Sequence, residues 1–285
     1  MERRHNKQMW MFDTRLRFTS FVVIIASLLC VECGGSVGFN LFPDSKDITL
    51  GRQVDDEIRK DPAAYPILKH RPDVRRFVQE IGERILASPA ITKRGVYAYE
   101  FEVIHDDNTI NAFCTPGGYI YVYTGLMKFL DNEATLAGVI GHEIAHAERR
   151  HATRRMTTHL GYQLVLSVVL GDNPGQVGMI AGNLFTGLAL LKNSRGDEEE
   201  SDTYSFKYLQ STEYYPGAIR FFFEKVQQQG GGNRSGSFER LLSTHPLPQD
   251  RFDHIQSMLD AIGNPAPAES NLFAARYQKF KSTLP

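Results

Sequence analysis

Residues 132–156 read NEATLAGVIGHEIAHAERRHATRRM and carry the strongest structural signal in the chain. Within it, apolar residues recur at the three- and four-residue spacing of a helix that buries one face: Leu136, Val139, Ile140 and Ile144. Asp131 or Asn132 suits the N-cap, because a short polar side chain there can accept a hydrogen bond from the first turn. The pattern predicts one long helix from about residue 132 to about Met156.

His142, Glu143 and His146 lie inside this helix in the order His-Glu-Ile-Ala-His. Residues four apart on a helix are rotated by only about 40°, so both imidazoles leave the same face one turn apart. Two imidazoles at this spacing can bind one zinc ion, and Glu143 can then accept a proton from a water molecule at the open position. The sequence therefore predicts a site for one zinc ion per chain, with Glu143 as a catalytic residue.

A third metal ligand must come from elsewhere in the chain. His151 follows His142 by nine residues, which is about 900° of helix rotation and puts it on the opposite face. Four arginines surround it in the sequence: Arg149, Arg150, Arg154 and Arg155. We therefore expect His151 to be a surface histidine and not a ligand.

The acidic run DEEESD at 197–202 offers a carboxylate ligand, as in zinc sites that combine two histidines with a glutamate. Glu198 and Asp202 are four residues apart and share a helix face. The first can reach the metal while the second accepts a hydrogen bond from a ligand histidine. Spacing alone leaves Glu198, Glu199 and Glu200 nearly equal as candidates.

The remaining segments predict a mostly helical α+β fold with a small sheet. Helical periodicity or helix-start signals occur at 48–59 and 73–87, from residue 194, from Pro216, and at 249–262, while alternation predicts strands at 97–103 and 119–123. Residues 160–191 are apolar and interrupted by glycines. They indicate a helical hairpin over the core, or else a lid or membrane-facing patch.

The N-terminus has the layout of an export signal. An arginine-rich flank precedes the apolar run FVVIIASLLCV at 21–31 and small residues at 34–36. The run is shorter than the roughly 20 residues needed to span a bilayer, which favours a signal peptide over a retained anchor. Cys33 before Gly-Gly-Ser is similar to a lipoprotein start, but Glu32 stands where such a site has a small residue. Cys114 is then the one cysteine of the mature chain.

The composition argues against nucleic-acid binding. The formal net charge is −1, so the chain has no global basic field. We expect three parts: a signal peptide or N-terminal anchor at 1–36, a metallopeptidase domain at 37–265 and a C-terminal tail at 266–285.

Together these segments resemble the zinc metallopeptidase family that includes the CAAX prenyl endopeptidase, the heat-shock protease HtpX and the periplasmic assembly protease BepA. The resemblance covers about residues 46–251. It is carried by five groups of residues: Leu50-Gly51-Arg52; Asn111-Ala112-Phe113 with Pro116-Gly117-Gly118-Tyr119; the His142 to His146 motif; Ser194-Arg195 with Glu198 and Asp202; and Thr244-His245-Pro246 with Arg251. The chain departs from the family at Ser201, usually alanine, and Ser205, usually glycine.

This resemblance implies a zincin-like fold in which the edge strand of a small sheet lines the active-site cleft. It selects Glu198 as the third ligand and gives Asp202 the supporting role. The strand at 119–123, with Asn111 and Ala112 before it, resembles the edge that holds peptide substrates, so Asn111, Ala112, Gly118 and Tyr119 are candidate substrate-binding residues. His245 resembles a histidine that gates the zinc or helps stabilise the tetrahedral intermediate, and Arg251 either fixes its loop or lies at the surface.

The implied function is zinc-dependent hydrolysis of peptide bonds in unfolded or misassembled proteins of the cell envelope, with the enzyme exported to the periplasm or envelope. Two alternatives remain from the sequence. One is a zinc-containing binding module held shut by His245 as a fourth ligand. The other is a membrane-surface protease that docks through residues 160–191 or its N-terminus.

Overall fold

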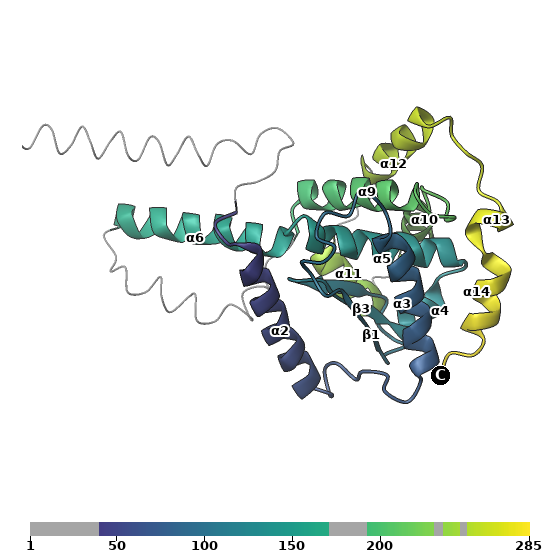
Figure 1. Ribbon diagram of the computed structural model, residues 1–285, viewed down its shortest axis with the longest axis horizontal. Coiled ribbons are helices and arrows are strands. Elements are labelled where there is room, and N and C mark those ends of the chain that lie inside the picture. The colour runs from purple at the N-terminus through teal and green to yellow at the C-terminus, as the bar shows by residue number, and fades with distance from the viewer. Residues whose placement is uncertain (1–39, 171–192, 231–235, 246–249) are drawn as a thin grey trace, which may run out of the picture. The chain divides into compact units, whose positions relative to one another are not determined.

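The computed structural model describes residues 40–170, 193–230, 236–245 and 250–285 (Figure 1). Its helices are α2 (Asp44–Lys60), α3 (Pro72–Leu86), α4 (Thr124–Phe129), α5 (Glu133–Glu148), α6 (His151–Leu170), α9 (Arg195–Leu209), α10 (Ile219–Gly230), α11 (Glu239–Thr244), α12 (Asp250–Ala261), α13 (Glu269–Leu272) and α14 (Ala274–Lys281). The strands are β1 (Glu100–Ile104), β2 (Ala112–Thr115) and β3 (Tyr119–Tyr123). The mostly helical α+β class with one small sheet is confirmed.

The sheet has the order β1-β3-β2, with β1 parallel and β2 antiparallel to β3. β3 is thus the central strand and all its residues are buried, so the prediction that 119–123 forms a substrate-holding edge is wrong. The edge strand that packs against α5 is β2. β1 begins at Glu100, three residues later than expected, because Tyr99 has a left-handed backbone with a φ of 48°.

The central helix α5 is buried along its whole length. Asn132 is its N-cap and accepts a hydrogen bond from the backbone N–H of Thr135 at 2.8 Å. The helix does not continue to Met156 as expected. It ends at Glu148, because Arg150 adopts a left-handed backbone with a φ of 59°, and α6 starts anew at His151.

The helix α9 lies beside α5 and packs closely against it (Figure 1). Ser194 begins α9 as the N-cap and forms a capping box with Asp197. The close approach occurs at Gly141, where an added Cβ would lie 2.8 Å from Oγ of Ser205. Ser205, the position at which the family usually has glycine, is accommodated because its hydroxyl donates to the carbonyl oxygen of Gly138 at 2.8 Å.

The segment that we expected to be a C-terminal tail forms α13 and α14, and both pack against α5. Tyr277 of α14 is fully buried, and its hydroxyl donates to the carbonyl oxygen of Met127 at 2.6 Å. Arg276 forms an ion pair with the buried Glu133 in the first turn of α5. The helix that we expected from Pro216 begins three residues later, at Ile219.

Two predictions fall wholly or partly outside the described residues. These are the export signal or anchor at 1–36 and the part of the apolar hairpin beyond residue 170. Where the structure describes the chain, no helix combines the length and the apolar character needed to cross a bilayer.

Candidate metal centre

The two histidines of α5 point to a common place. Nε2 of His142 and Nε2 of His146 are 3.0 Å apart, and both side chains are buried. This follows from the helical spacing that the sequence predicts, since one turn separates the two residues. The nitrogens that face each other are the Nε2 atoms, and each ring directs its Nδ1 atom to another partner.

The helix α9 brings Glu198 to the same place. Its Oε2 atom lies 3.4 Å from Nε2 of His142, and its Oε1 atom lies 3.3 Å from Nε2 of His146. The side chain of Glu199 is 61% exposed, and Glu200 binds Arg149 instead. Of the three acids that spacing left nearly equal, the structure therefore brings only Glu198 to the histidine pair.

His245, the residue that follows α11, completes the cluster. Its Nδ1 atom lies 3.0 and 3.1 Å from the two carboxylate oxygens of Glu198, and its Nε2 atom lies 3.7 Å from Oε1 of Glu143. One ligand atom each from His142, His146, Glu198 and His245 lies within 4.8 Å of the others. The structure thus gathers all the residues that we predicted to be at the metal.

The spacing of these donors fits a metal ion. Tetrahedral ligands at about 2.0–2.1 Å from one zinc ion stand about 3.3–3.4 Å from each other. The three separations among His142, His146 and Glu198 are 3.0, 3.3 and 3.4 Å. Two imidazoles and one carboxylate are also a common donor set for a catalytic zinc site with an open position.

Asp202 supports the first histidine as predicted, with Oδ1 2.8 Å from Nδ1 of His142. Arg251 is buried, so a surface location for it is excluded. Its guanidinium donates to both oxygens of Asp202, at 2.6 and 2.7 Å, and to Oε2 of Glu198 at 2.9 Å. The two acids are therefore held in place by a common buried cation.

The electrostatics of the cluster favour a cation. Burial acts to raise the pKa of the Glu198 carboxyl, but His245, His142 and His146 together hold this pKa well below its usual range. Burial lowers the pKa of His146 well below its usual value, which favours the neutral imidazole that a metal requires. Burial opposes charge on His142 too, yet Asp202 and Glu198 raise its pKa to about 9. The carboxylates thus attract positive charge to this point.

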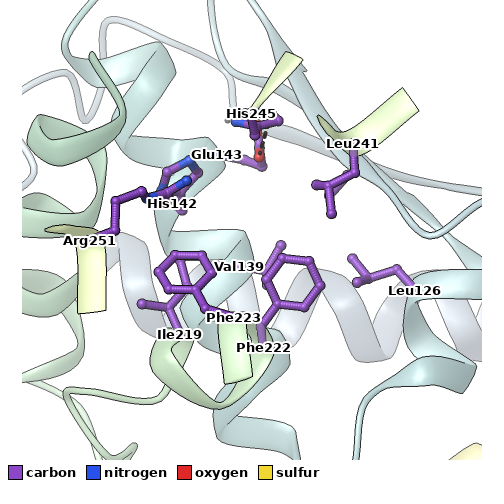
Figure 2. Close-up of a pocket in the computed structure, with 11 residues that line it drawn as sticks. Leu126, Val139, His142, Glu143, Ile219, Phe222, Phe223, Leu241, His245 and Arg251 are labelled. Carbon is purple, nitrogen blue, oxygen red and sulfur yellow. Dashed lines mark ion pairs between the residues drawn. The ribbon is translucent and has the colours of Figure 1, made fainter. Parts of the chain in front are cut away.

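Glu143 lines two cavities beside the cluster. The smaller has a volume of about 20 Å³ and a largely apolar lining (Figure 2): Leu126, Val139, Ile219, Phe222, Phe223 and Leu241. The larger is a cleft of about 310 Å³ that His146, Thr115 and Asn193 also line. Figure 2 shows Glu143 and His245 directed toward one another. The carboxylate of Glu143 is therefore next to both the histidine His245 and the space of the two cavities.

The predicted substrate-binding residues divide into two pairs. Ala112 lines the smaller cavity and Asn111 the larger one, where its Oδ1 atom is buried without a hydrogen-bond partner among the described residues. Tyr119 instead packs in a second apolar cluster with residues of α2, and Gly118 lies under the ring of Tyr99. Neither Gly118 nor Tyr119 lines these two cavities.

The structure also places residues at the site that sequence reasoning missed. Nδ2 of Asn193 donates to Oε1 of Glu198 at 2.6 Å and lies 3.4 Å from Nε2 of His146. No sequence pattern distinguishes Asn193, which simply precedes the N-cap of α9. His151 is buried beside His146, so the prediction of a surface histidine is wrong. His151 does not lie on the face of α5 opposite to His142, because α5 ends at Glu148 and His151 begins a separate helix after the left-handed Arg150.

A family model described as peptidase family M48 matches residues 72–259, and the chain belongs to this family. The matched range includes the sheet, the four clustered residues His142, His146, Glu198 and His245, and Arg251. The resemblance inferred from the sequence motifs is thus confirmed.

Similar proteins carry related names. A beta-barrel assembly-enhancing protease of Yersinia pestis is 27% identical over 252 residues, covering 85% of this chain and 49% of that protein. Metalloprotease LoiP of Escherichia coli is 33% identical over 159 residues, covering 54% of this chain and 60% of that protein. The mitochondrial metalloendopeptidase OMA1 of Arabidopsis thaliana is 35% identical over 152 residues, covering 52% of this chain and 29% of that protein. The chain spans about half the length of the assembly-enhancing proteases that it matches.

Proposed function

We propose that this chain is a zinc-dependent metalloendopeptidase in which His142, His146 and Glu198 hold one zinc ion. The observation that carries the proposal is the convergence of these three donors, from two helices, at the spacing of tetrahedral ligands beside Glu143. Membership of a peptidase family supports the reaction class. A bound zinc ion supplies a Lewis acid for the peptide carbonyl and lowers the pKa of a bound water to about 7.

The residues of this chain have distinct roles in the proposed reaction. Glu143 accepts a proton from the attacking water and later delivers it to the leaving amine, acting first as general base and then as general acid. Asp202 accepts a hydrogen bond from Nδ1 of His142 and holds that imidazole in the orientation that directs Nε2 inward. Arg251 donates to Asp202 and to Glu198 and so fixes both carboxylates. Although burial acts to raise the pKa of Asp202, the charge of Arg251 lowers it.

The substrate that this geometry favours is an extended polypeptide. β2 is an edge strand, and Phe113, Cys114 and Thr115 of β2 line the larger cleft together with Glu143. An unpaired strand edge binds any extended peptide through main-chain hydrogen bonds. Asn111 and Ala112, at the start of β2, lie within reach of such a peptide. We infer that unfolded or misassembled proteins of the cell envelope are the substrates, in line with the names of the assembly-enhancing relatives, and that the enzyme is exported.

One pair of measurements tests the proposal. Metal content by mass spectrometry should give one zinc ion per chain, and the purified protein should cleave an unfolded polypeptide. Glu143→Gln removes the proton acceptor and keeps the shape, so turnover should fall by about 10²–10⁴-fold while zinc content stays the same. Full turnover in Glu143→Gln would show that the role given to Glu143 is wrong.

His245 favours a second candidate, a zinc-containing binding module with little turnover. Its Nδ1 atom is close enough to Glu198 for the imidazole to fill the open coordination position as a fourth ligand. Turnover of His245→Ala separates the roles. A gain indicates that His245 gates an enzyme, a loss indicates that it helps stabilise the tetrahedral intermediate, and absence of turnover in both proteins supports the binding module.

Association with a membrane surface, through residues 160–191 or the N-terminus, is a separate proposal. Flotation of the protein with lipid vesicles, with and without residues 160–191, tests the first route. Equal flotation of the two proteins would exclude that segment as the membrane contact.

A further inference from the structure

His151 is the first residue of α6, directly after the left-handed Arg150 that ends the preceding helix. It is only 1% exposed, and its Nδ1 atom lies 2.6 Å from Nδ1 of His146. The other nitrogen of His146, Nε2, faces His142 and Glu198. The two nitrogens of His146 thus have different partners: Nε2 faces His142 and Glu198, and Nδ1 faces His151.

The contacts continue beyond His151. Its Nε2 atom lies 3.0 Å from Oε2 of Glu200. Glu200 is held in turn by Nε of Arg149 at 2.7 Å and by the guanidinium of Arg154 at 2.9 Å. A connected set of side chains therefore runs from His146 through His151 and Glu200 to two arginines.

One assignment of protons satisfies this set in a metal-bound site. A histidine binds a metal through an unprotonated nitrogen, so Nε2 of His146 carries no proton and its Nδ1 atom carries one. His151 must then accept that proton's hydrogen bond at its own Nδ1 atom. Its remaining proton lies on Nε2, where the acceptor is Glu200, a carboxylate whose pKa is held low by His151 and Arg154 despite its partial burial.

We infer that His151 is a positioning residue for the metal centre, which holds His146 in the Nδ1–H tautomer with Nε2 directed at the ion. This inference rests on the proposed zinc site. The two ligand histidines of α5 are then oriented by different means. His142 donates to the carboxylate of Asp202 directly, whereas His146 donates to an imidazole that is itself oriented by the carboxylate of Glu200.

Ser201 supplies a matched control next to the same atom. Its hydroxyl oxygen lies 3.3 Å from Nδ1 of His151, and this is the position at which the family usually has alanine. The single lone pair on Nδ1 is already used by the shorter contact with His146. Loss of the Ser201 hydroxyl should therefore leave the orientation of His146 unchanged.

Zinc affinity provides the test, measured on the full chain by competition with a chromogenic chelator. His151→Phe keeps the ring volume and removes the acceptor, so the dissociation constant for zinc should rise by about 10–100-fold. His151→Asn places an acceptor oxygen close to the position of Nδ1 and should restore most of the affinity. Ser201→Ala should bind zinc as the wild type does. So should His254→Phe, which removes a half-buried histidine of α12 that contacts Thr203.

Several outcomes would overturn the inference. Equal zinc affinity in the wild type and His151→Phe would exclude the positioning role and leave the proposed function intact. Failure of the wild type to bind zinc would remove the proposed function and this inference together.

A measurement on the wild type covers the case in which His151→Phe does not fold. Long-range ¹H–¹⁵N NMR of the zinc-loaded protein should show a proton on Nδ1 of His146 and on Nε2 of His151. A spectrum in which Nδ1 of His146 carries no proton would contradict the inference regardless of any variant.

Discussion

The guanidinium of Arg251 donates to both carboxylate oxygens of Asp202, and neither side chain is more than 4% exposed. The same guanidinium reaches Glu198 and stacks over the ring of Phe223, 4.3 Å from its centroid. One buried cation from α12 thus forms ion pairs with two carboxylates of α9 that converge on the histidines of α5. Three helices far apart in the sequence meet at this point.

Arg251→Met is expected to destabilise the metal-free protein. The change removes the positive charge that pairs with the buried carboxylates of Asp202 and Glu198. Removing one partner of a buried ion pair typically costs about 3–5 kcal/mol of stability. Urea denaturation, followed by circular dichroism, measures the change in the free energy of unfolding. Arg76→Met on the exposed face of α3 is the control and should change this free energy by no more than about 0.5 kcal/mol. Similar values for the two variants would contradict the structural role of Arg251.

Glu198→Gln and Glu199→Gln should differ in zinc content. The amide at position 198 is neutral and a weaker ligand, so we expect this variant to be purified with less than about a tenth of the wild-type zinc. Glu199 is largely exposed, so its variant should keep one ion per chain. Zinc loss on changing Glu199 but not Glu198 would show that the wrong acid has been assigned to the metal.

Gly51→Ala should lower the stability of the protein and Gly196→Ala should raise it, although both glycines lie in helices. A Cβ atom at Gly51 would lie 1.8 Å from the carbonyl oxygen of Pro116, so the turn before β3 must move at a cost of about 1–3 kcal/mol. At Gly196 the nearest atom would be 3.8 Å away, and alanine should stabilise the protein by about 0.4–1 kcal/mol. Thermal denaturation of both variants measures the difference. Equal melting temperatures would mean that α2 does not approach the turn this closely.

Tyr277 tests whether the C-terminal segment is part of the core. Its side chain is fully buried, and its ring contacts Phe77 and Phe280. Tyr277→Ala should lower the free energy of unfolding by about 3–5 kcal/mol, as for other buried aromatic residues. Tyr277→Phe removes only the hydrogen bond to Met127 and should cost about 0.5–1.5 kcal/mol. A negligible cost for Tyr277→Ala would indicate a loosely attached tail.

Local patterns predicted the identity of most elements but not all of their ends. The period of α5 and its Asn132 cap were readable, because both depend on residues within one or two turns. The end of α5 at Glu148 could not be predicted from the local pattern. The left-handed Arg150 is followed by a new helix, and its side chain is held by Asp47 of α2 at 2.7 Å, about a hundred residues away. No pattern around residue 150 contains that contact.

In the sheet, too, the local pattern predicted an element but not its neighbours. Alternation predicted a strand at 119–123, because alternating side chains need a pleated surface with two faces. It could not show that this strand is central, since strand order depends on which other segments pair with it. In the structure β1 pairs with one side of β3 in parallel orientation, and β2 pairs with the other side in antiparallel orientation. The edge available to a peptide is therefore on β2, one strand away from the expected position.

Local spacing was enough to predict that His142 and His146 share one helix face with Glu143 beside them, because four residues make about one turn in any helix. Spacing narrowed the third donor to three adjacent acids, and the family resemblance pointed to Glu198 among them. The packing of the helices brings Glu198 to the histidine pair, buries His151 behind His146 and places Arg251 between the carboxylates. These choices depend on how α5, α6, α9 and α12 pack, and the contacts that decide that packing join residues tens of positions apart.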